Sequence, residues 1–168
     1  MELKMILAMD LDGCIGKQNG LPWRLRSDML RFKHLTVGEG NNAVLMGRTT
    51  WESLPSAYRP LPQRANIVVT RNTEYSLHDV DVVYSIESGI QLARNNECDE
   101  CWIIGGANVY EQCRDMVEEI HLTSVETSNS GDVKVALFGE EWNREVVESI
   151  PQDSENEHPT TYMILTKS

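Results

Sequence analysis

Apolar segments alternate with amphipathic segments in the N-terminal part of the chain. Apolar and β-branched residues crowd into 3–9, 43–46, 67–70, 80–84 and 102–104. Such runs predict strands buried on both faces of a sheet. Apolar residues at helical spacing, with Ser85 as a capping side chain and Gly38 as a stop, predict helices over 25–37, 49–54, 86–94 and 108–115. Strands alternating with helices are typical of a mostly parallel sheet covered on both faces.

After Val117, the alternation of predicted strands and helices gives way to predicted strands separated by turns. We predict strands over 119–126, 133–138, 145–150 and 160–166, and the polar segment 151–159 predicts a long hairpin loop. We therefore expect residues 1–168 to form a single α/β domain. Its centre is a mostly parallel twisted sheet of about eight strands with antiparallel C-terminal strands, flanked by about four helices.

Length and charge limit the possible functions. The 168 residues can bury roughly two thirds of the unfolded surface, so folding needs neither a disulfide nor a metal. The net charge of −11 argues against binding to nucleic acid or to an anionic membrane, because both need a basic surface. The apolar start is too short for a signal core or a membrane helix, and the four cysteines lack zinc-site spacing. We expect a cytoplasmic protein with reduced thiols and no metal.

The segments that follow the predicted parallel strands contain candidate chemistry, because ligands bind beyond the carboxyl ends of such strands. Gly105-Gly106 opens a predicted helix, where free N–H groups and the helix dipole favour an anion. Arg48 and Arg71 follow two other strands and add positive charge. A glycine pair alone is equally consistent with a tight turn, but together with the two arginines it predicts a polyphosphate site.

Three further side chains are candidates. Asp28 falls on the predicted sheet-facing side of helix 25–37, with Phe32 at i+4 and Leu35 at i+7. It is either a first-turn partner of the helix dipole or a buried functional acid, whose pKa burial would raise. Arg59 and Arg64 lie in a Pro-rich loop. Each is either a solvated side chain or a clamp for a ligand carboxylate.

Taken together, these segments resemble dihydrofolate reductase over nearly the whole chain. They include Leu21-Pro22-Trp23, Asp28 with Phe32 one turn later, and Gly105-Gly106 after a buried strand. The matching segments are 12–16, 21–23, 27–33, 44–54, 59–64, 66–71, 103–110 and 122–123. The resemblance implies hydride transfer from NADPH to C6 of 7,8-dihydrofolate with protonation at N5. The product, tetrahydrofolate, serves one-carbon and thymidylate metabolism. Dihydrofolate and antifolates are the implied ligands, and a single domain without an exposed apolar helix suggests a monomer.

By position, the resemblance assigns Asp28, Trp23 and Leu21 to catalysis. Asp28 would bind N3 and the 2-amino group of the pterin and promote protonation at N5. Trp23 would help to hold a water beside it, and Thr123 would support the same network. Whether Asp28 or an ordered water delivers the proton stays open. Arg64 would take the α-carboxylate of the glutamate tail. The implied substrate site comprises Ile6, Ala8, Asp28, Met29, Phe32, Lys33, Leu54, Arg59, Arg64, Ile104, Tyr110 and Thr123.

The implied cofactor site surrounds NADPH from several strand ends. Residues 48–50 would meet its phosphates, Thr70 and Arg71 the adenosine 2′-phosphate, and 105–109 the pyrophosphate, with a cis peptide between the two glycines. The full set is Ala8, Ile15, Gly16, Gly47, Arg48, Thr49, Thr50, Val69, Thr70, Arg71, Ile104, Gly105, Gly106, Ala107, Asn108 and Val109.

Residues 13–23 would form a mobile loop that closes over the nicotinamide, and closing it would exclude water from the site. Gly131-Asp132 would be the segment that bonds to this loop. Cys14 lies within the predicted mobile loop 13–23. Its side chain is either a small apolar filler, which we favour, or an exposed oxidisable thiol.

Two departures from the family pattern concern the cofactor. Asn108 stands where some members carry an arginine near the pyrophosphate, and Thr49 where some carry a basic residue. With Asn108, the pyrophosphate contact would be weaker or supplied by Arg48. Thr49 slightly weakens the case for NADPH over NADH, whereas Arg71 keeps NADPH favoured.

Two alternatives remain beside this interpretation. One is a reductase that acts on a ribosylated pyrimidine of riboflavin synthesis, which shares the fold and the cofactor but does not predict Leu21-Pro22-Trp23 or Asp28. The other is a non-catalytic NADPH- or folate-binding protein on the same fold. Tight binding of NADPH or an antifolate without turnover would indicate the latter.

Overall fold

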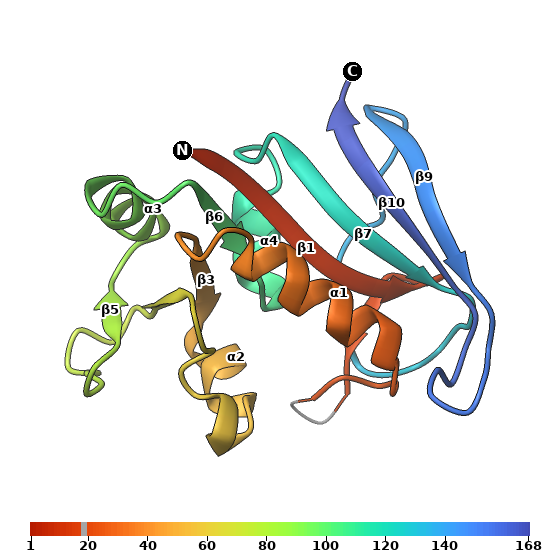
Figure 1. The fold of residues 1–168 in the computed structure, drawn as a ribbon, viewed down its shortest axis with the longest axis horizontal. Coiled ribbons are helices and arrows are strands. Elements are labelled where there is room, and N and C mark those ends of the chain that lie inside the picture. The colour runs from red at the N-terminus through yellow and green to blue at the C-terminus, as the bar shows by residue number, and fades with distance from the viewer. Residues whose placement is uncertain (18–19) are drawn as a thin grey trace.

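An eight-stranded sheet forms the centre of the molecule in the computed structural model, which describes residues 1–17 and 20–168 (Figure 1). In spatial order its strands are Asp81–Val83 (β5), Ala65–Val69 (β4), Ala43–Gly47 (β3), Glu100–Ile103 (β6), Glu2–Asp10 (β1), Glu119–Val125 (β7), Thr160–Lys167 (β10) and Trp142–Ile150 (β9). All neighbours from β5 to β7 pair in parallel, and β10 is antiparallel to both β7 and β9. The predicted mostly parallel sheet with antiparallel C-terminal pairing is confirmed.

The helices are Arg26–Val37 (α1), Arg48–Ser53 (α2), Ile86–Asn95 (α3) and Ala107–Cys113 (α4), with a short 3₁₀ helix at Ser56–Tyr58. They lie close to the predicted ranges, and the helix after Ser85 begins with that side chain accepting a hydrogen bond from the Ser88 N–H. None of the described helices has both the length and the apolar character needed to cross a membrane.

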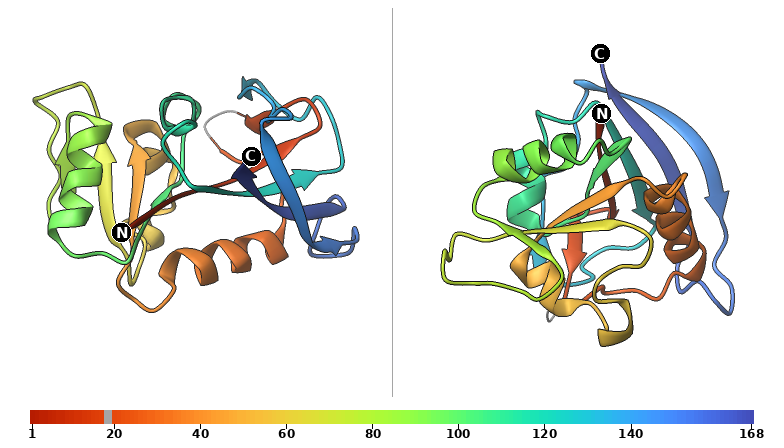
Figure 2. Two further views of the ribbon diagram at one scale, coloured as in Figure 1. Left: turned by 90° about the horizontal axis from the view of Figure 1, so that it is seen from above. Right: turned by 60° about the vertical axis from the view of Figure 1, so that its left-hand side comes forward.

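The alternation of side chains along β1 divides the core into two layers. Leu3, Met5, Leu7 and Met9 pack with α3 and α4 in one cluster. Ile6 faces the other side and packs with β3, β6 and α2, while α1 covers this layer. In the view from above, α1 and α4 lie on opposite sides of β1 (Figure 2). Both faces of the central strand are therefore buried, as its apolar sequence predicts.

Helix α1 is held at its start by the distant loop 151–159. The Arg26 N–H donates to the Glu155 carbonyl at 3.1 Å, and the Ser27 N–H donates to Asn156 Oδ1 at 3.1 Å. These contacts satisfy N–H groups that a helix start leaves free. They also fix the position of Asp28, the next residue.

The predicted strand over 133–138 is wrong. Only Val133–Lys134 (β8) is extended, and it pairs with Cys14–Gly16 (β2), a short strand that the sequence pattern did not predict. Val135 and Phe138 instead pack irregularly against the main core. The apolar spacing therefore reflects burial of loop side chains rather than a strand of the main sheet.

All four cysteines are free and buried, Cys14 included. The Cys14 thiol donates to the Gly16 carbonyl at 3.5 Å. Burial raises the pKa of the Cys14 thiol above its usual value. This agrees with its interpretation as an apolar filler rather than an exposed oxidisable group.

Candidate active site

Asp28 lies in the first turn of α1 and turns toward the sheet. Thr123, which pairs with Ala8 in the middle of the β1–β7 ladder, donates its hydroxyl hydrogen to Asp28 Oδ1 at 2.5 Å. Burial raises the pKa of the Asp28 carboxyl above its usual value, and the bonds from Thr123 and Arg31 lower it by less. The predicted direction of the shift is confirmed. A carboxyl in this setting is suited to exchanging or directing a proton.

Trp23 is buried against Leu25, Val125 and Ala8. Its indole Nε1–H is buried and finds no acceptor among the described residues. A buried donor of this kind is normally satisfied by an ordered water or a ligand. Leu21, two residues earlier, is 62% exposed and lies at the surface.

An apolar surface adjoins Asp28. Ile6 and Ile104 belong to one buried cluster, and Phe32 and Leu54 pack against it. Met29 is 56% exposed beside Asp28. Apolar side chains beside a largely buried carboxyl are what a site for a flat aromatic ligand requires.

Tyr110 supports this surface from the opposite layer of the core. It packs in the cluster with α3 and α4, and its hydroxyl donates to the Ile6 carbonyl at 2.8 Å. Burial raises the pKa of Tyr110 far above its usual value, so the phenol stays neutral. The structure therefore gives Tyr110 a hydrogen bond to the backbone of the apolar surface.

The two arginines of the Pro-rich loop have different surroundings. Arg64 Nη1 donates to Thr36 Oγ1 at 3.0 Å and Nε to the Pro62 carbonyl at 2.8 Å, and its guanidinium lies 6.0 Å from the centre of the Phe32 ring. Arg59 directs Nη2 to the carbonyls of Glu52 and Leu54. Arg64 is thus fixed beside the apolar surface, whereas Arg59 ties down backbone.

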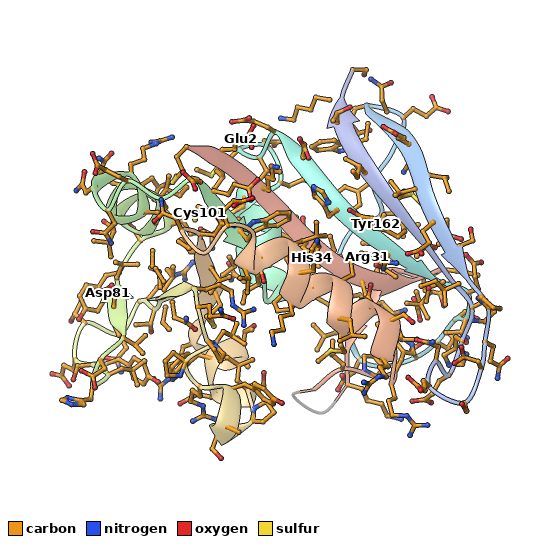
Figure 3. The ribbon with its side chains drawn as sticks, in the orientation of Figure 1. Glu2, Arg31, His34, Asp81, Cys101 and Tyr162 are labelled. Carbon is orange, nitrogen blue, oxygen red and sulfur yellow. The ribbon has the colours of Figure 1, made fainter. Side chains whose placement is uncertain are left out.

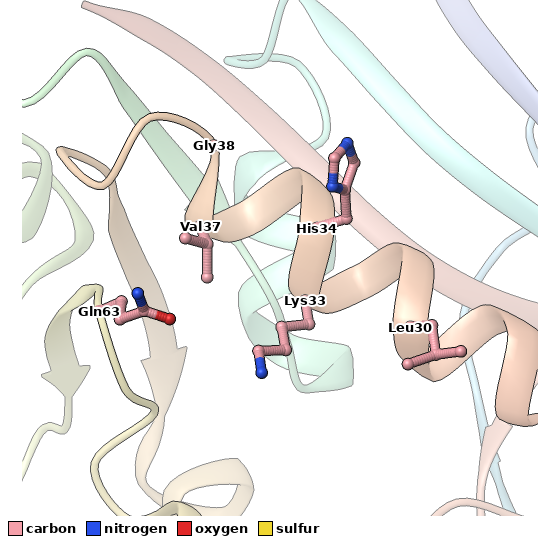
Figure 4. A pocket seen from close by; sticks show the side chains of 6 residues that line it. All are labelled: Leu30, Lys33, His34, Val37, Gly38 and Gln63. Atoms are coloured by element: carbon pink, nitrogen blue, oxygen red, sulfur yellow. The ribbon is translucent and has the colours of Figure 1, made fainter.

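A hollow of about 260 Å³ lies on the outer side of α1, next to the segment that carries Arg64. Lys33 lines it, and Val37 faces Gln63 across it (Figure 4). Lys33 therefore lies at the rim of the candidate site, near the segment that carries Gln63 and Arg64. Its lining residues are Leu30, Lys33, His34, Val37, Gly38 and Gln63.

Glycines that follow two neighbouring strands lie close together: Gly47 ends β3, and Gly105 comes shortly after the end of β6. The Gly47 N–H donates to the Gly105 carbonyl at 2.8 Å, and the Gly105–Gly106 peptide is cis, as the resemblance implied. A Cβ added to Gly106 would lie 3.2 Å from Thr50 Oγ1, and one added to Gly47 would lie 3.2 Å from Val109. These residues form a narrow backbone surface onto which a phosphate chain could fit closely.

Cationic and polar side chains surround the glycines. Arg48 lies 3.4 Å from Glu52 and over the Tyr75 ring, and Arg71 is exposed just beyond the end of β4. Thr49 and Asn108 are exposed, and Ala107 starts α4. Thr70 Oγ1 accepts a hydrogen bond from the Asn72 N–H, and Val69 pairs with Gly47. In the part of the chain that is described, no group of three His, Cys, Asp or Glu side chains could hold a metal.

The segment after β1 bonds to Asp132, one of the two residues 131–132 that the resemblance implied. The Asp132 N–H donates to the Gly16 carbonyl at 3.1 Å. Asp10 joins both segments, since its carboxylate accepts from the N–H groups of Cys14 at 2.9 Å and Ser130 at 3.1 Å. Ile15 packs against the main core. Residues 18 and 19 of the predicted mobile loop lie outside the described residues.

Sequence reasoning missed Arg31. Its guanidinium donates to Asp28 Oδ1 at 3.1 Å, one turn of α1 earlier. The signal was available, because an acid followed by a base at i+3 forms a pair on a helix surface.

The fold and the site together define a class. A parallel α/β sheet with glycines and arginines at its strand ends, next to a buried carboxyl on an apolar surface, is the arrangement of a dinucleotide-dependent oxidoreductase. Comparison with known proteins makes this specific: the family model for dihydrofolate reductase matches residues 2–167.

Individual similar proteins are named as members of the same family. The chain is 37% identical over 141 residues to the dihydrofolate reductase of Mycobacterium leprae, covering 82% of each. It is 34% identical over 170 residues to that of Staphylococcus aureus, covering 99% of each. Among solved structures, dihydrofolate reductase from Enterococcus faecalis complexed with NADP(H) and RAB-propyl is similar with a TM-score of 0.83 and 29% identity, covering 99% of this chain and 96% of that one. The chain belongs to the dihydrofolate reductase family, whose members reduce dihydrofolate with NADPH.

Proposed function

We propose that Asp28 is the residue of this NADPH-dependent reductase that binds the pterin and promotes protonation at N5. The observation that supports this most is the Asp28 carboxyl itself, which is largely buried beside an apolar surface, with both of its described hydrogen bonds on Oδ1. Oδ2 is then available to the N3 and 2-amino groups of a pterin. Thr123 and the buried Trp23 indole complete the polar lining.

The remaining substrate contacts follow from the same geometry. Ile6, Ile104, Phe32 and Leu54 form one face against which the pterin and benzoyl rings would pack, with Ala8, Met29 and Leu21 at its margins. Arg64 would bind the α-carboxylate of the glutamate tail through its fork of N–H donors. Lys33 lies at the rim, and Arg59 and Tyr110 support the backbone.

The residues at the strand ends fit a dinucleotide. NADPH, when bound, supplies the hydride, and the protein aligns the rings and excludes water. Gly47, Gly105 and Gly106 allow backbone to approach the pyrophosphate, and Thr50 and Arg48 lie beside them. Arg71 and Thr70, just beyond the end of β4, would meet the 2′-phosphate. Gly16 and Ile15 start the segment that would cover the nicotinamide.

Substitution of Asp28 by Asn tests this assignment. Asn keeps the size and removes the acid, so we expect dihydrofolate-dependent NADPH oxidation at neutral pH to fall by about 10²–10⁴-fold. The affinity for NADPH should change little, because Asp28 lies on the substrate side. Equal turnover of both proteins would contradict the role of Asp28. Tight NADPH binding without turnover by the unaltered protein would instead indicate the non-catalytic alternative.

We further propose that residues 1–168 act as one domain, as a monomer in the cytoplasm. The family match over 2–167 and the sheet that runs through both halves of the chain support the first point. The placement in the cytoplasm rests on the buried, free thiols, which are typical of a reducing compartment. The monomer is what we expect of a single domain.

A further inference from the structure

Arg31 is held at three points beside Asp28. Its Nη1 donates to Asp28 Oδ1 at 3.1 Å, and its Nη2 donates to Glu148 Oε1 of β9 at 2.5 Å. Its guanidinium lies 4.3 Å from the centre of the Tyr162 ring of β10. Figure 3 shows Arg31 of α1 and Tyr162 of β10 close to one another. A guanidinium fixed by two carboxylates and an aromatic face has little freedom to move away.

We propose that Arg31 is a positioning residue that sets the charge state of Asp28, and that Glu148 limits how strongly it does so. The inference rests on the proposed role of Asp28 in the reaction. It adds a residue pair outside the substrate contacts that determines the pH at which the carboxyl works.

The different exposure of the Arg31, Asp28 and Glu148 side chains explains why the charge of Arg31 acts on Asp28. The Arg31 side chain is 12% exposed and that of Asp28 is 24% exposed, so water screens their attraction only in part. The Glu148 side chain is 57% exposed, so it is more screened and neutralises Arg31 incompletely. Asp28 therefore experiences a net positive neighbour.

The other groups that face Asp28 carry no charge near neutral pH. Thr123 of β7 is a hydroxyl, and burial raises the pKa of Tyr110 of α4 and of Tyr162 of β10, so both phenols stay protonated. His121 Nδ1 lies 2.7 Å from the Tyr162 hydroxyl, and burial lowers the pKa of His121, which keeps the imidazole neutral. Within the described part of the site, Arg31 is the charged partner of Asp28.

The two partners should act in opposite directions. Protonation at N5 requires a proton on the pair formed by substrate and Asp28, so the rate of the hydride step falls as pH rises through the apparent pKa of that pair. Without the charge of Arg31, the carboxylate is less favoured, and the falling limb moves to higher pH. Without the charge of Glu148, Arg31 is no longer compensated, and the limb moves to lower pH. A role in packing alone would shift both variants the same way or neither.

Three variants, Arg31→Met, Arg31→Lys and Glu148→Gln, test the proposal. Single-turnover NADPH oxidation is followed from about pH 5 to 9.5. For Arg31→Met we expect the falling limb to move up by about half a unit to one unit, given that an adjacent Arg lowers a carboxyl pKa by about one to three units. Arg31→Lys should restore most of this, and Glu148→Gln, which keeps an acceptor oxygen, should shift the limb down.

A second measurement is independent of turnover. Titration of the ¹³C-labelled Asp28 carboxyl by NMR, with the signal identified by its loss in Asp28→Asn, reports the pKa of that group in the free protein. The same order of shifts is expected. If no dihydrofolate-dependent oxidation occurs in the unaltered protein, the proposed function fails, and the NMR titration still decides this inference.

Three results would overturn the proposal. They are superimposable titrations of the unaltered protein and Arg31→Met, a shift of Glu148→Gln in the same direction as Arg31→Met, and failure of Arg31→Lys to restore the limb. Should Arg31→Met not fold, Glu148→Gln decides alone: a downward shift supports the proposal, and an unchanged or upward titration overturns it.

Discussion

At the scale of single residues, the structure distinguishes two arginines, Arg59 and Arg64, that have similar positions in one Pro-rich loop. Arg64 is anchored by Thr36 and Pro62 beside the apolar surface, whereas the Nη2 group of Arg59 is already engaged by two backbone carbonyls. A charge-assisted bond contributes about 1.5–3 kcal/mol, so we expect Arg64→Gln to raise the KM for dihydrofolate by about 10–100-fold. Steady-state kinetics checks this. The matched Arg59→Gln should change KM by less than about threefold, and the reverse order would assign the carboxylate to Arg59.

What sequence can predict at this scale depends on whether a residue acts within its own segment. The position of Asp28 on the sheet-facing side of α1 follows from helical spacing with Phe32 and Leu35, and the structure confirms the upward direction of its pKa. The link from Arg31 to Glu148 and Tyr162 joins α1 to β9 and β10, which are more than a hundred residues away. Spacing along one helix contains no information about such a partner. Sequence therefore predicts the acid and leaves its electrostatic partner unknown.

At the scale of elements, the contact between the segment after β1 and residues 130–132 depends on one glycine. A Cβ at Gly131 would lie 2.3 Å from the Gly16 carbonyl oxygen, so Gly131→Ala must separate the segments and weaken the bond from the Asp132 N–H. Because Gly16 and Ile15 start the covering loop, we expect the hydride-transfer rate to fall by about 10-fold or more, since small misplacements at a site cost about that much. Single-turnover kinetics measures it.

A second glycine of the same loop provides the control. Among the described residues, a Cβ at Gly20 would meet only the Lys17 carbonyl oxygen, at 3.9 Å, so Gly20→Ala adds the same methyl without a clash there. It should leave the rate within about twofold of the unaltered protein, because exposed substitutions without a clash have small effects. Equal loss in both variants would mean that loop flexibility, and not the contact with 131–132, controls the step.

Elements were predicted well where burial imposes a strict pattern and poorly where it does not. The ranges for β1, β3 and α3 match because continuous apolar runs and a capping serine define them locally. The short β2–β8 pairing was missed, since two and three residues are too few for a period to be recognised. Its partners are set by Asp10, whose carboxylate binds both segments from the end of β1.

At the scale of the whole molecule, a net charge of −11 is compatible with two anionic ligands because the cations lie where the anions would bind. Arg48 and Arg71 follow the carboxyl ends of β3 and β4, whereas Arg64 precedes β4 at the opposite end of that strand, beside Phe32 of α1. Local charge at these positions outweighs the average of a protein surface, because exposed charges farther than about 8–10 Å are largely screened at physiological salt. The composition excluded polyanions as partners, and the placement of arginines explains why small anions are not excluded.

The sheet makes both ligand sites parts of one unit, which predicts how the protein unfolds. Strand β1 pairs with β6 toward the cofactor residues and with β7, which carries Thr123, toward the substrate residues, and a single core cluster spans both sides. We expect one calorimetric transition whose van't Hoff and calorimetric enthalpies agree. NADPH at about 100 times its Kd adds about 2.7 kcal/mol and should raise Tm by about 5–10 °C for a chain of this size, without splitting the transition. Two transitions, of which NADPH moves only one, would mean that the cofactor and substrate halves of the sheet unfold separately, and the proposal of a single domain would then be wrong.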